Sequence, residues 1–491
     1  MQDIKDLALI IDSHVPLIVL ETHDETHALQ LLTRVAMQYQ LGYFCWSITE
    51  GLNRLGFADD RRTTDPESPT DVLRQIKRNT SKSLYALCDF HPYLHDQPEH
   101  VRLLKDIALS YSRLGHSIVL ISHELDLPPE LKRHSAKFSL SLPGDAQLMA
   151  LIREEAQAWG RDNPQAPLQS DQATVKKLVR NLRGLTEGDA RRLARGAIRN
   201  DGAITESDLP EVNRAKFDLL DMGSVLSFEC DTARFSEVGG LQHLKAWIGK
   251  REQAMLAHGK DRPKGVLLLG VQGSGKSLAA KAIAGLWGMP LLRLDMAALY
   301  NKYIGETEKN LRKSLQQAEL MAPCVLWMDE IEKGLASGGD QDDGTSRRVL
   351  GTLLTWMAER DANVFTVATA NDVDGLPPEL MRKGRFDEIF FVDLPDLEAR
   401  REIFAIHLKN RNFDPAQFDL EILATRAEQF SGAEIEQAVV AALYSGCARR
   451  EPLHTQLILQ EIDGTYPLAI TLAEKITALR SWAEGRTVPA N

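Results

Sequence analysis

The chain has 491 residues, of which 43% are hydrophobic and 26% are charged. A single hydrophobic core rarely grows beyond about 250 residues, so this length predicts two or three globular domains, and the composition excludes a largely disordered chain. The net charge of -11, from 58 basic and 69 acidic residues, argues against nucleic acid as the general partner.

The cysteine usage and the hydropathy pattern favour the cytoplasm. The five cysteines lie far apart and form no Cys-x-x-Cys pair, which is typical of a reducing compartment. The amino-terminal segment carries Asp3 and Asp6 instead of a cationic start, so we expect no signal peptide. Apolar runs such as Ala438–Tyr444 are well below the ~18 residues that cross a bilayer, and we expect no membrane partner.

The first half alternates buried-strand patterns with helical patterns. The strand candidates are PLIVLE from Pro16, YFCWSI from Tyr43, LYALCDF from Leu84 and SIVLIS from Ser117. This alternation predicts an α/β domain with a parallel sheet over residues 1–154. An Arg-rich helical stretch, 155–208, follows as a lid-like subdomain. Residues 209–235 are less regular, and we interpret them as a linker.

The second half repeats this plan more strongly. GVLLL, CVLWM and VFTVATA mark buried strands of a second parallel sheet within residues 236–396. Residues 397–491 have helical periodicity and predict a lid with a short tail. LPPEL follows a buried strand in both halves, at Leu127 and Leu376, and a phenylalanine strand ending in Leu-Pro comes next each time. The matched order suggests a duplication.

The segment GVQGSGKS, Gly270–Ser277, follows a buried strand and opens a helix. Backbone N–H groups of such a loop surround a phosphate, and the positive end of the helix dipole adds to the attraction. Lys276 is expected to reach the β- and γ-phosphates, and the Ser277 hydroxyl to bind Mg²⁺. An ordinary glycine turn is the alternative, which the strand and helix on either side disfavour. The expected phosphate-binding residues are Gly270, Gln272, Gly273, Ser274, Gly275, Lys276, Ser277 and Leu278.

Polar residues follow the next two strands of the second half. CVLWM is followed by Asp329 and Glu330, at the sheet edge where ligands of parallel sheets bind. Asp329 is suited to holding Mg²⁺, largely through water, and Glu330 to polarising an attacking water; a solvated acidic turn is the alternative. Asn371 closes VFTVATAN, where a neutral amide can orient that water. RKGRFD then supplies Arg382 and Arg385, although isolated arginines are most often solvated.

These segments together resemble the AAA ATPase module. The resemblance rests on FSEVGGLQHLK, GVLLLGVQGSGKS, NKYIGETEKNLR, CVLWMDE, SRRVLGTLLTWM, ATAND and LMRKGRFD, and it covers about Phe235–Ala448. The set includes the second region of homology, so it is far more specific than a phosphate loop alone. The layout of a weak half followed by a complete one resembles more narrowly the bacterial and plastid AAA family first noted as a hypothetical chloroplast reading frame.

The resemblance implies two tandem P-loop-type cores, the first degenerate, each followed by a helical lid. It implies ATP and Mg²⁺ as ligands, Asn371 as sensor 1, and Arg382 and Arg385 as arginine fingers that act in a neighbouring subunit. The assembly it implies is a homo-oligomer, a hexameric ring. The residues it places around the nucleotide, beyond the phosphate loop, are Val238 and Gly239 beside the adenine and His407, Gly432 and Ala433 from the lid.

Tyr303, Ile304 and Gly305 resemble the pore loop with which family members grip an extended polypeptide. An aromatic ring can pack against backbone of any sequence, and the glycine lets the loop move; a buried tyrosine is the alternative. The resemblance thus implies a chaperone-like, Mg-dependent ATP phosphohydrolase that remodels or threads a protein substrate. A nucleotide-dependent switch or assembly scaffold is the alternative function, and the acidic charge disfavours a nucleic-acid motor.

The first half lacks the residues of a phosphate site. PLIVLETHDETHAL takes the place of the phosphate loop and contains no glycine and no lysine, so we expect a domain that does not hydrolyse nucleotide. Its acidic strand ends at Asp89, and Ser122 takes the sensor position. The segment from His23 to His27, and His91 with His95, raise the question of a metal site. With no third ligand evident, we interpret these histidines as solvated.

Overall fold

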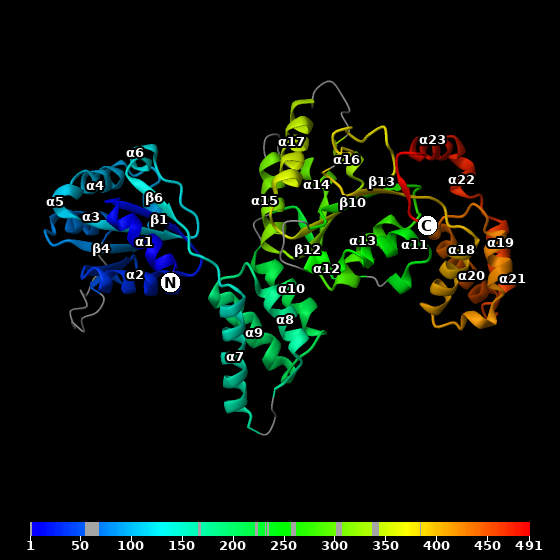
Figure 1. The fold of residues 1–491 in the computed structure, drawn as a ribbon, viewed down its shortest axis with the longest axis horizontal. Coiled ribbons are helices and arrows are strands. Elements are labelled where there is room, and N and C mark those ends of the chain that lie inside the picture. The colour runs from blue at the N-terminus through cyan, green and yellow to red at the C-terminus, as the bar shows by residue number, and fades with distance from the viewer. Residues whose placement is uncertain are drawn as a thin grey trace. The chain divides into compact units, whose positions relative to one another are not determined.

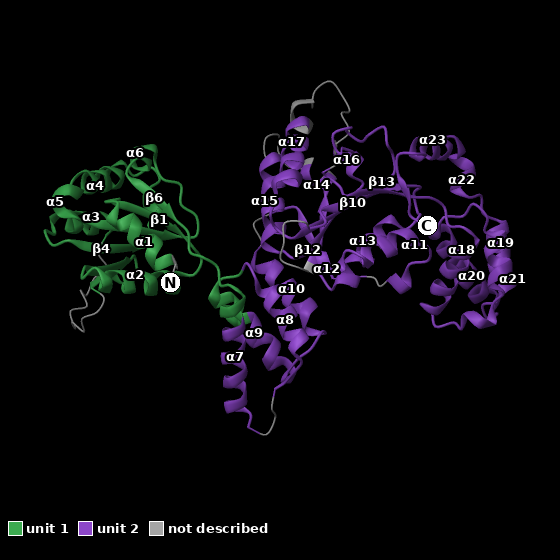
Figure 2. Cartoon of the chain, viewed as in Figure 1, with its two compact units in different colours: residues 1–148, 185–192 green, residues 149–184, 193–491 purple. Residues whose placement is uncertain are grey.

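The computed structural model describes residues 2–54, 68–164, 168–220, 224–230, 232, 235–256, 262–300, 307–335, 343–382 and 384–491. The chain divides into two compact units (Figure 2). The first comprises residues 1–148 and 185–192, and the second comprises residues 149–184 and 193–491.

The first unit is a sheet between two helical layers (Figure 1). The strands are β1 (Leu17–Glu21), β2 (Gly42–Ser47), β3 (Gly51–Arg54), β4 (Ser83–Cys88), β5 (Ser117–Ser122) and β6 (Ser135–Phe138), in the order β3-β2-β4-β5-β1-β6. All neighbouring pairs are parallel except β2 with β3. Every residue of β4 and β5 is buried, as expected of parallel strands covered on both faces.

Two layers of helices cover this sheet. Helices α1 (Gln2–Asp12) and α2 (Glu25–Gln38) pack on one face, and α3 (Pro69–Arg78) and α4 (Pro98–Leu109) on the other. Ser68 caps α3, because its hydroxyl accepts a hydrogen bond from the N–H of Asp71 at 3.2 Å, and Pro69 takes the first helical position. The short helices are α5 (Tyr111–Leu114), α6 (Pro129–Lys132) and the 3-10 turn η1 (His91–Tyr93).

A helical segment follows the first sheet along the chain. It contains α7 (Asp145–Asp162), α8 (Gln172–Leu182), α9 (Glu187–Asp201) and α10 (Asp208–Leu219), with a two-stranded sheet of β7 (Gln169–Ser170) and β8 (Ala203–Ile204). The buried carboxylate of Glu155 in α7 accepts two hydrogen bonds from the guanidinium of Arg195 in α9, at 2.8 and 3.1 Å. This paired arrangement joins the two helices.

The segment 209–235 differs from the irregular linker that its sequence predicts. Helix α10 covers its first part, and β9 (Leu226–Glu229) pairs antiparallel with β11 as an edge strand of the second sheet. The linker prediction is wrong for α10 and β9. The strand could not be recognised from local sequence, because its four residues gain their hydrogen-bond partners from β11, a distant part of the chain.

The second unit contains a seven-stranded sheet in the order β15-β14-β10-β13-β12-β11-β9. Its strands besides β9 are β10 (Gly265–Gly270), β11 (Leu291–Asp295), β12 (Cys324–Asp329), β13 (Val364–Ala370), β14 (Glu388–Val392) and β15 (Val488–Pro489). In chain order, the five parallel strands β10 to β14 take the same sheet order as β1, β2, β4, β5 and β6 of the first unit. Both sheets therefore place the end of their first strand between the ends of their fourth and fifth.

Helices cover both faces of this sheet as well (Figure 1). On one side are α11 (Gln242–Gly249), α12 (Glu252–Leu256) and α13 (Lys276–Trp287), and on the other α14 (Met296–Tyr300), α15 (Thr307–Leu320), α16 (Ile331–Leu335) and α17 (Asp343–Glu359). The 3-10 turn η2 (Phe235–Glu237) precedes α11. These observations establish α/β architecture with parallel sheets.

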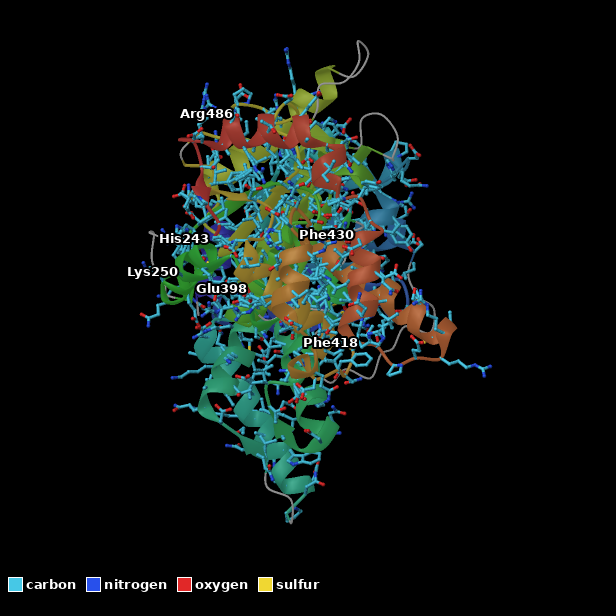
Figure 3. The ribbon with its side chains drawn as sticks, turned by 90° about the vertical axis from the view of Figure 1, so that its right-hand side faces the viewer. His243, Lys250, Glu398, Phe418, Phe430 and Arg486 are labelled. Atoms are coloured by element: carbon cyan, nitrogen blue, oxygen red, sulfur yellow. The ribbon has the colours of Figure 1, made fainter. Side chains whose placement is uncertain are left out.

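Four carboxyl-terminal helices form a separate small core, namely α18 (Leu397–Lys409), α19 (Leu420–Arg426), α20 (Gly432–Arg449) and α21 (Thr455–Asp463), with the 3-10 turn η3 (Pro415–Gln417) between α18 and α19 in the chain. Helices α22 (Leu468–Thr471) and α23 (Ala473–Ala483) follow, and Leu479 and Trp482 of α23 pack against the core of the second sheet. Phe418 and Phe430, labelled in Figure 3, are buried in the small core. Ser431 and Glu434 form a capping box at the start of α20.

The predicted short tail is in fact part of the second sheet. Strand β15 pairs parallel with β14, and the carbonyl of Ala490 accepts hydrogen bonds from the N–H groups of His243 and Leu244 at 3.0 and 3.1 Å. The end of the described chain therefore ties the lid helices back to the core that carries α11.

Candidate nucleotide site

The loop between β10 and α13 turns on two glycines. Gly273 has a φ of +77° and Gly275 a φ of +93°, the left-handed region that glycine adopts without strain. No side chain in the described parts of the chain caps α13, so the N–H groups of its first turn remain available to an anion. The buried hydroxyl of Ser274 likewise finds no partner among the described residues. These donors fit the oxygens of a bound phosphate chain.

Lys276, the first residue of α13, is held inside the loop. Its side chain is buried, and Nζ donates hydrogen bonds to the carbonyl oxygens of Gly270 at 2.9 Å and Val271 at 2.6 Å. Burial lowers the pKa of Lys276 to about 8, although neighbouring carboxylates oppose the shift. A phosphate entering the loop would meet a cation that two backbone carbonyls hold in place.

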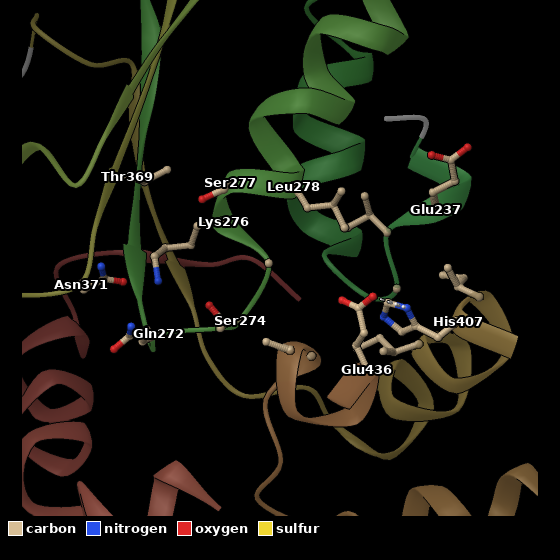
Figure 4. Close-up of a pocket in the computed structure, with 18 of the residues that line it drawn as sticks. Glu237, Gln272, Ser274, Lys276, Ser277, Leu278, Thr369, Asn371, His407 and Glu436 are labelled. Atoms are coloured by element: carbon tan, nitrogen blue, oxygen red, sulfur yellow. Dashed lines mark ion pairs between the residues drawn. The ribbon is translucent and has the colours of Figure 1, made fainter. Parts of the chain in front are cut away.

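Ser277 and Asp329 come together at the end of β12. Ser277 Oγ lies 3.4 Å from Asp329 Oδ1, which also accepts a hydrogen bond from Thr369 Oγ1 at 2.7 Å. The other carboxylate oxygen accepts from Arg293 at 3.3 Å. Hydroxyl and carboxylate oxygens are the donors that Mg²⁺ prefers, so this pair fits that ion. Figure 4 shows Ser277 on the side of the pocket that Thr369 also lines.

Glu330 is fixed by three partners. Its N–H donates to Thr369 Oγ1 at 3.0 Å, Oε1 accepts from Asn371 Nδ2 at 3.1 Å, and Oε2 forms an ion pair with Lys333 at 2.5 Å. The backbone of Glu330 is left-handed, with a φ of +48°, a conformation that residues other than glycine seldom adopt and that is often found at functional sites.

Asn371 is held from its backbone as well as from its side chain. Its N–H donates to Oε1 of the buried Glu332 at 3.0 Å. Burial raises the pKa of Glu332, and the hydrogen bond from Asn371 opposes that shift. Glu330 and Glu332, which follow β12, therefore both accept hydrogen bonds from Asn371, which follows β13. These two hydrogen bonds set the position of the Asn371 side-chain amide.

The lid reaches the phosphate loop through close backbone contacts. The N–H of Ala433 donates to the carbonyl of Gly273 at 3.1 Å. The lid also packs closely on the loop before α11, which contains Gly239. A Cβ at Gly239 would lie 2.7 Å from Cγ1 of Ile403, so only glycine fits where that loop passes α18. His407 of α18 lies 3.7 Å from a carboxylate oxygen of Glu436, and burial lowers the pKa of the imidazole.

These elements enclose a cavity of about 320 Å³, within the range of about 300–1,000 Å³ that small-molecule sites occupy. The predicted residues that line it come from the loop before α11, the phosphate loop, the ends of β12 and β13, and the lid. They are Val238, Gly239, Gln272, Gly273, Ser274, Gly275, Lys276, Ser277, Leu278, Asp329, Glu330, Asn371, His407, Gly432 and Ala433.

Five further residues line the cavity that the sequence did not single out, namely Glu237, Thr369, Ile403, Ile406 and Glu436. Thr369 stands near the end of β13, two residues before Asn371, so strand alternation continued through Ala370 would place the two side chains on the same face. Ile403 and Glu436 lie four residues from His407 and Gly432 on their helices, which also places them on the same faces. Strand and helix periodicity around the predicted residues could have identified these three.

Other predicted residues stand elsewhere. Gly270, Arg382 and Arg385 are not among the described residues that line the cavity. Arg382 is exposed, and the half-buried Arg385 donates a hydrogen bond to the carbonyl of Leu354. Tyr303, Ile304 and Gly305 lie outside the described residues.

The sequence matches three models of protein families. The ATPase family associated with various cellular activities (AAA) matches residues 266–394, and the N-terminal and second domains of SpoVK-like AAA ATPases match residues 3–140 and 146–223. The AAA domain-containing protein ycf46 of Guillardia theta is 34% identical, over 98% of this chain and 95% of its own length. This chain belongs to the AAA ATPase family.

Other relatives of this AAA ATPase match it to different extents. The ycf46 protein of Pyropia yezoensis is 34% identical over 98% of each chain. The proteasome-activating nucleotidase of Aeropyrum pernix is 36% identical, but over 53% of this chain and 66% of its own length. The resemblance to the AAA module and the narrower resemblance to the chloroplast-reading-frame family are both confirmed.

Within the described ranges of this AAA ATPase, no helix has a stretch of 18 residues apolar enough for a membrane crossing.

Proposed function

We propose that this AAA ATPase binds ATP in the cavity between the phosphate loop and the lid and hydrolyses it to ADP and phosphate. The observation that carries the proposal is the cluster at the ends of β12 and β13. There Asn371 donates a hydrogen bond of 3.1 Å to Glu330, and both residues line the same cavity as Lys276. Glu330 takes the proton of the attacking water, and Asn371 orients that water toward the γ-phosphate. A bound Mg²⁺, held by Ser277 and Asp329, supplies charge neutralisation at the phosphates.

The remaining predicted residues take positions suited to binding. Lys276 neutralises the β- and γ-phosphates. The backbone N–H groups of the phosphate loop surround the phosphate chain. Val238 and Gly239 contact the adenine from one side, and His407, Gly432 and Ala433 enclose it from the lid. Since the pKa of His407 is lowered by burial, its ring is neutral near pH 7 and suited to packing on a base.

The proposal is tested by measuring phosphate release from Mg²⁺-ATP by the full chain. Lys276→Ala should abolish both nucleotide binding and turnover, because the variant loses the cation at the phosphates. Lys409→Ala, which removes an exposed lysine outside the cavity, serves as the matched control and should behave as the parent. Turnover that persists in Lys276→Ala would show that the hydrolysis arises elsewhere.

The domain layout proposed with this function has a degenerate AAA-like core at 1–154, a lid-like subdomain at 155–208, the large ATPase subdomain at 236–396 and the lid at 397–491. The shared strand order supports the duplication. In the first unit the segment between β1 and α2 is three residues long, and Asp24 caps α2 by accepting a hydrogen bond from the N–H of His27 at 3.0 Å. A carboxylate at this helix start repels phosphate, which agrees with a core that does not hydrolyse nucleotide.

We further infer a homo-hexameric ring in the cytoplasm, with Arg382 and Arg385 acting in the site of the neighbouring subunit. Neither arginine lines the cavity of its own chain, and Arg382 is exposed. An arginine contributed across a subunit boundary stabilises transition-state charge, by about 10³ to 10⁵ in rate. Hydrolysis would therefore depend on assembly.

We assign the energy of hydrolysis to remodelling or threading of a protein substrate, on the strength of the Tyr303–Gly305 motif. Tyr303→Ala should leave basal ATP turnover intact while abolishing unfolding of a captured substrate. A pull-down with the Glu330→Gln variant followed by mass spectrometry would supply that substrate or its adaptor. Unfolding that survives Tyr303→Ala would favour the switch or scaffold instead.

A further inference from the structure

Two imidazoles and a carboxylate gather at the edge of the first sheet. Asp89 follows β4, His91 lies in η1, and His123 follows β5. One potential ligand atom of each residue lies within 4.8 Å of those of the other two. Imidazole nitrogens with a carboxylate oxygen form a ligand set typical of Zn²⁺. No third ligand for His91 is evident from local sequence, because His123 lies 32 positions away and comes near it through the pairing of β4 with β5.

The same three positions meet in the nucleotide site of the second unit. Glu330 follows β12 and Asn371 follows β13, as Asp89 follows β4 and His123 follows β5. His123, and not Ser122 as expected from the sequence, therefore takes the sensor position. Asp89 also has a left-handed backbone, with a φ of +50° against +48° for Glu330. His91 stands two residues after Asp89, as Glu332 stands two after Glu330. The fold thus places these side chains together by the same strand ends that assemble the catalytic cluster.

The ring of His91 is oriented by a buried partner. The buried Ser122 Oγ lies 2.7 Å from His91 Nδ1 and 3.2 Å from the carbonyl oxygen of Glu124. The hydrogen bond with Ser122 engages Nδ1 and leaves Nε2 as the other ring nitrogen. A hydrogen bond of this kind on one ring nitrogen is the usual support for a histidine that binds metal through the other.

The cluster is accessible from solvent. Asp89 and His123 are exposed, and His91 is half-buried. The ring of His123 meets that of His91 edge-on, with ring centroids 4.9 Å apart. The ring of His23 also stacks on that of His123, with ring centroids 6.0 Å apart. Ligand atoms around tetrahedral Zn²⁺ lie about 3.3 Å apart, given bonds of about 2.0 Å, so rotations of exposed side chains suffice to close the site.

We propose that Asp89, His91 and His123 bind one Zn²⁺ ion at the edge of the first sheet, with water or His23 as the fourth ligand. The site takes the place that the catalytic cluster has in the second unit. The first unit would thus bind a cation at the end of its sheet, although Asp24, the cap of α2, takes the place of a phosphate loop there.

The test is calorimetric titration of the full chain with Zn²⁺ in excess Mg²⁺, without nucleotide. Mg²⁺ is a hard cation that occupies oxygen sites and leaves imidazole sites open. The expected result is one Zn²⁺ per chain. Substitution of Co²⁺ should give the visible absorption of a tetrahedral nitrogen and oxygen site without the near-ultraviolet band of a thiolate ligand, which separates this site from the cysteines.

Variants locate the ion. His123→Ala and Asp89→Asn change exposed side chains and should each weaken Zn²⁺ binding by at least about tenfold, since loss of a supporting group alone costs about 10–100-fold. Ser122→Ala should weaken it by about tenfold through His91. His95→Ala, which removes an exposed histidine of the same segment outside the cluster, is the matched control and should bind as the parent does. No stoichiometric binding by the parent, or equal affinity in the double variant His91→Ala/His123→Ala, would overturn the proposal.

Discussion

The side-chain amide of Asn371 donates a hydrogen bond of 3.1 Å to Oε1 of Glu330, across the carboxyl ends of β13 and β12. The hydrogen bond holds the carboxylate in the wall of the cavity that the phosphate loop also lines. An amide provides this contact without adding a second cation beside the Lys333 ammonium, which pairs with the other carboxylate oxygen. The proposed general base and the proposed γ-phosphate sensor are therefore joined directly by a hydrogen bond.

Glu330→Gln should bind ATP with little change but hydrolyse it at least about 100-fold more slowly, because the base is removed while the phosphate loop is untouched. Phosphate release in single-turnover experiments, beside titration with a fluorescent ATP analogue, separates the two effects. Glu398→Gln, at an exposed position of α18, makes the same chemical change outside the cavity. Equal loss of binding and turnover in Glu330→Gln would assign this residue to ATP binding instead.

ATP affinity should fall as the pH rises above about 8. The pKa of Lys276 is lowered to about 8 by burial in the nucleotide-free protein, and bound phosphates would raise it. Below that pKa the ammonium is already present and affinity is flat. Above it, binding must take up a proton, so Kd rises by up to about tenfold for each pH unit until the pKa of the bound state is reached.

This pH dependence has an internal control in Lys276→Arg. A guanidinium stays protonated throughout the range, so any ATP binding that the variant retains should show no such slope. Titrations with a fluorescent ATP analogue from about pH 7 to 10 provide the measurement. A flat profile for the parent would mean that the charge of Lys276 does not control affinity.

Gly239→Ala should weaken ATP binding by about tenfold and lower the melting temperature. The new Cβ would lie 2.7 Å from Ile403 Cγ1 and 3.2 Å from the carbonyl oxygen of Ala399, so the loop or α18 must shift, at a cost of about 1–3 kcal/mol. At Gly249 no described atom lies within 4 Å of an added Cβ, so Gly249→Ala is the matched control. Thermal unfolding and nucleotide titration of the two variants should differ, and equal behaviour would refute the close-contact argument.

Arg385→Ala and Arg382→Ala should each reduce ATP turnover by about 10³-fold without abolishing nucleotide binding. Mixing inactive Arg385→Ala chains with inactive Lys276→Ala chains should restore part of the activity. In a mixed ring, the intact phosphate loop of an Arg385→Ala chain would meet the intact arginines of a neighbouring Lys276→Ala chain. Arg426→Ala, which breaks an exposed ion pair with Asp463, serves as the control. Arg385 also donates to the Leu354 carbonyl, and failure of the mixture to recover would assign it that structural role alone.

The sequence by itself determined the chemistry of the second unit. The glycine spacing of the phosphate loop, the acidic pair after β12 and the amide after β13 are local patterns attached to strand ends, and parallel strands bring their ends to one edge. For that reason the cavity is lined by most of the residues predicted from short motifs. The α/β class followed likewise from apolar runs that alternate with amphipathic helices.

Tertiary structure decided what depends on pairing between distant segments. The strand character of Leu226–Glu229 and Val488–Pro489 comes from hydrogen bonds to β11 and β14, which no local pattern encodes. The histidine cluster required the same kind of information, since His91 and His123 meet only because β4 and β5 are neighbours in the sheet. Local propensity fixes which side chains stand at strand ends, but the order of strands in the sheet fixes which of them meet.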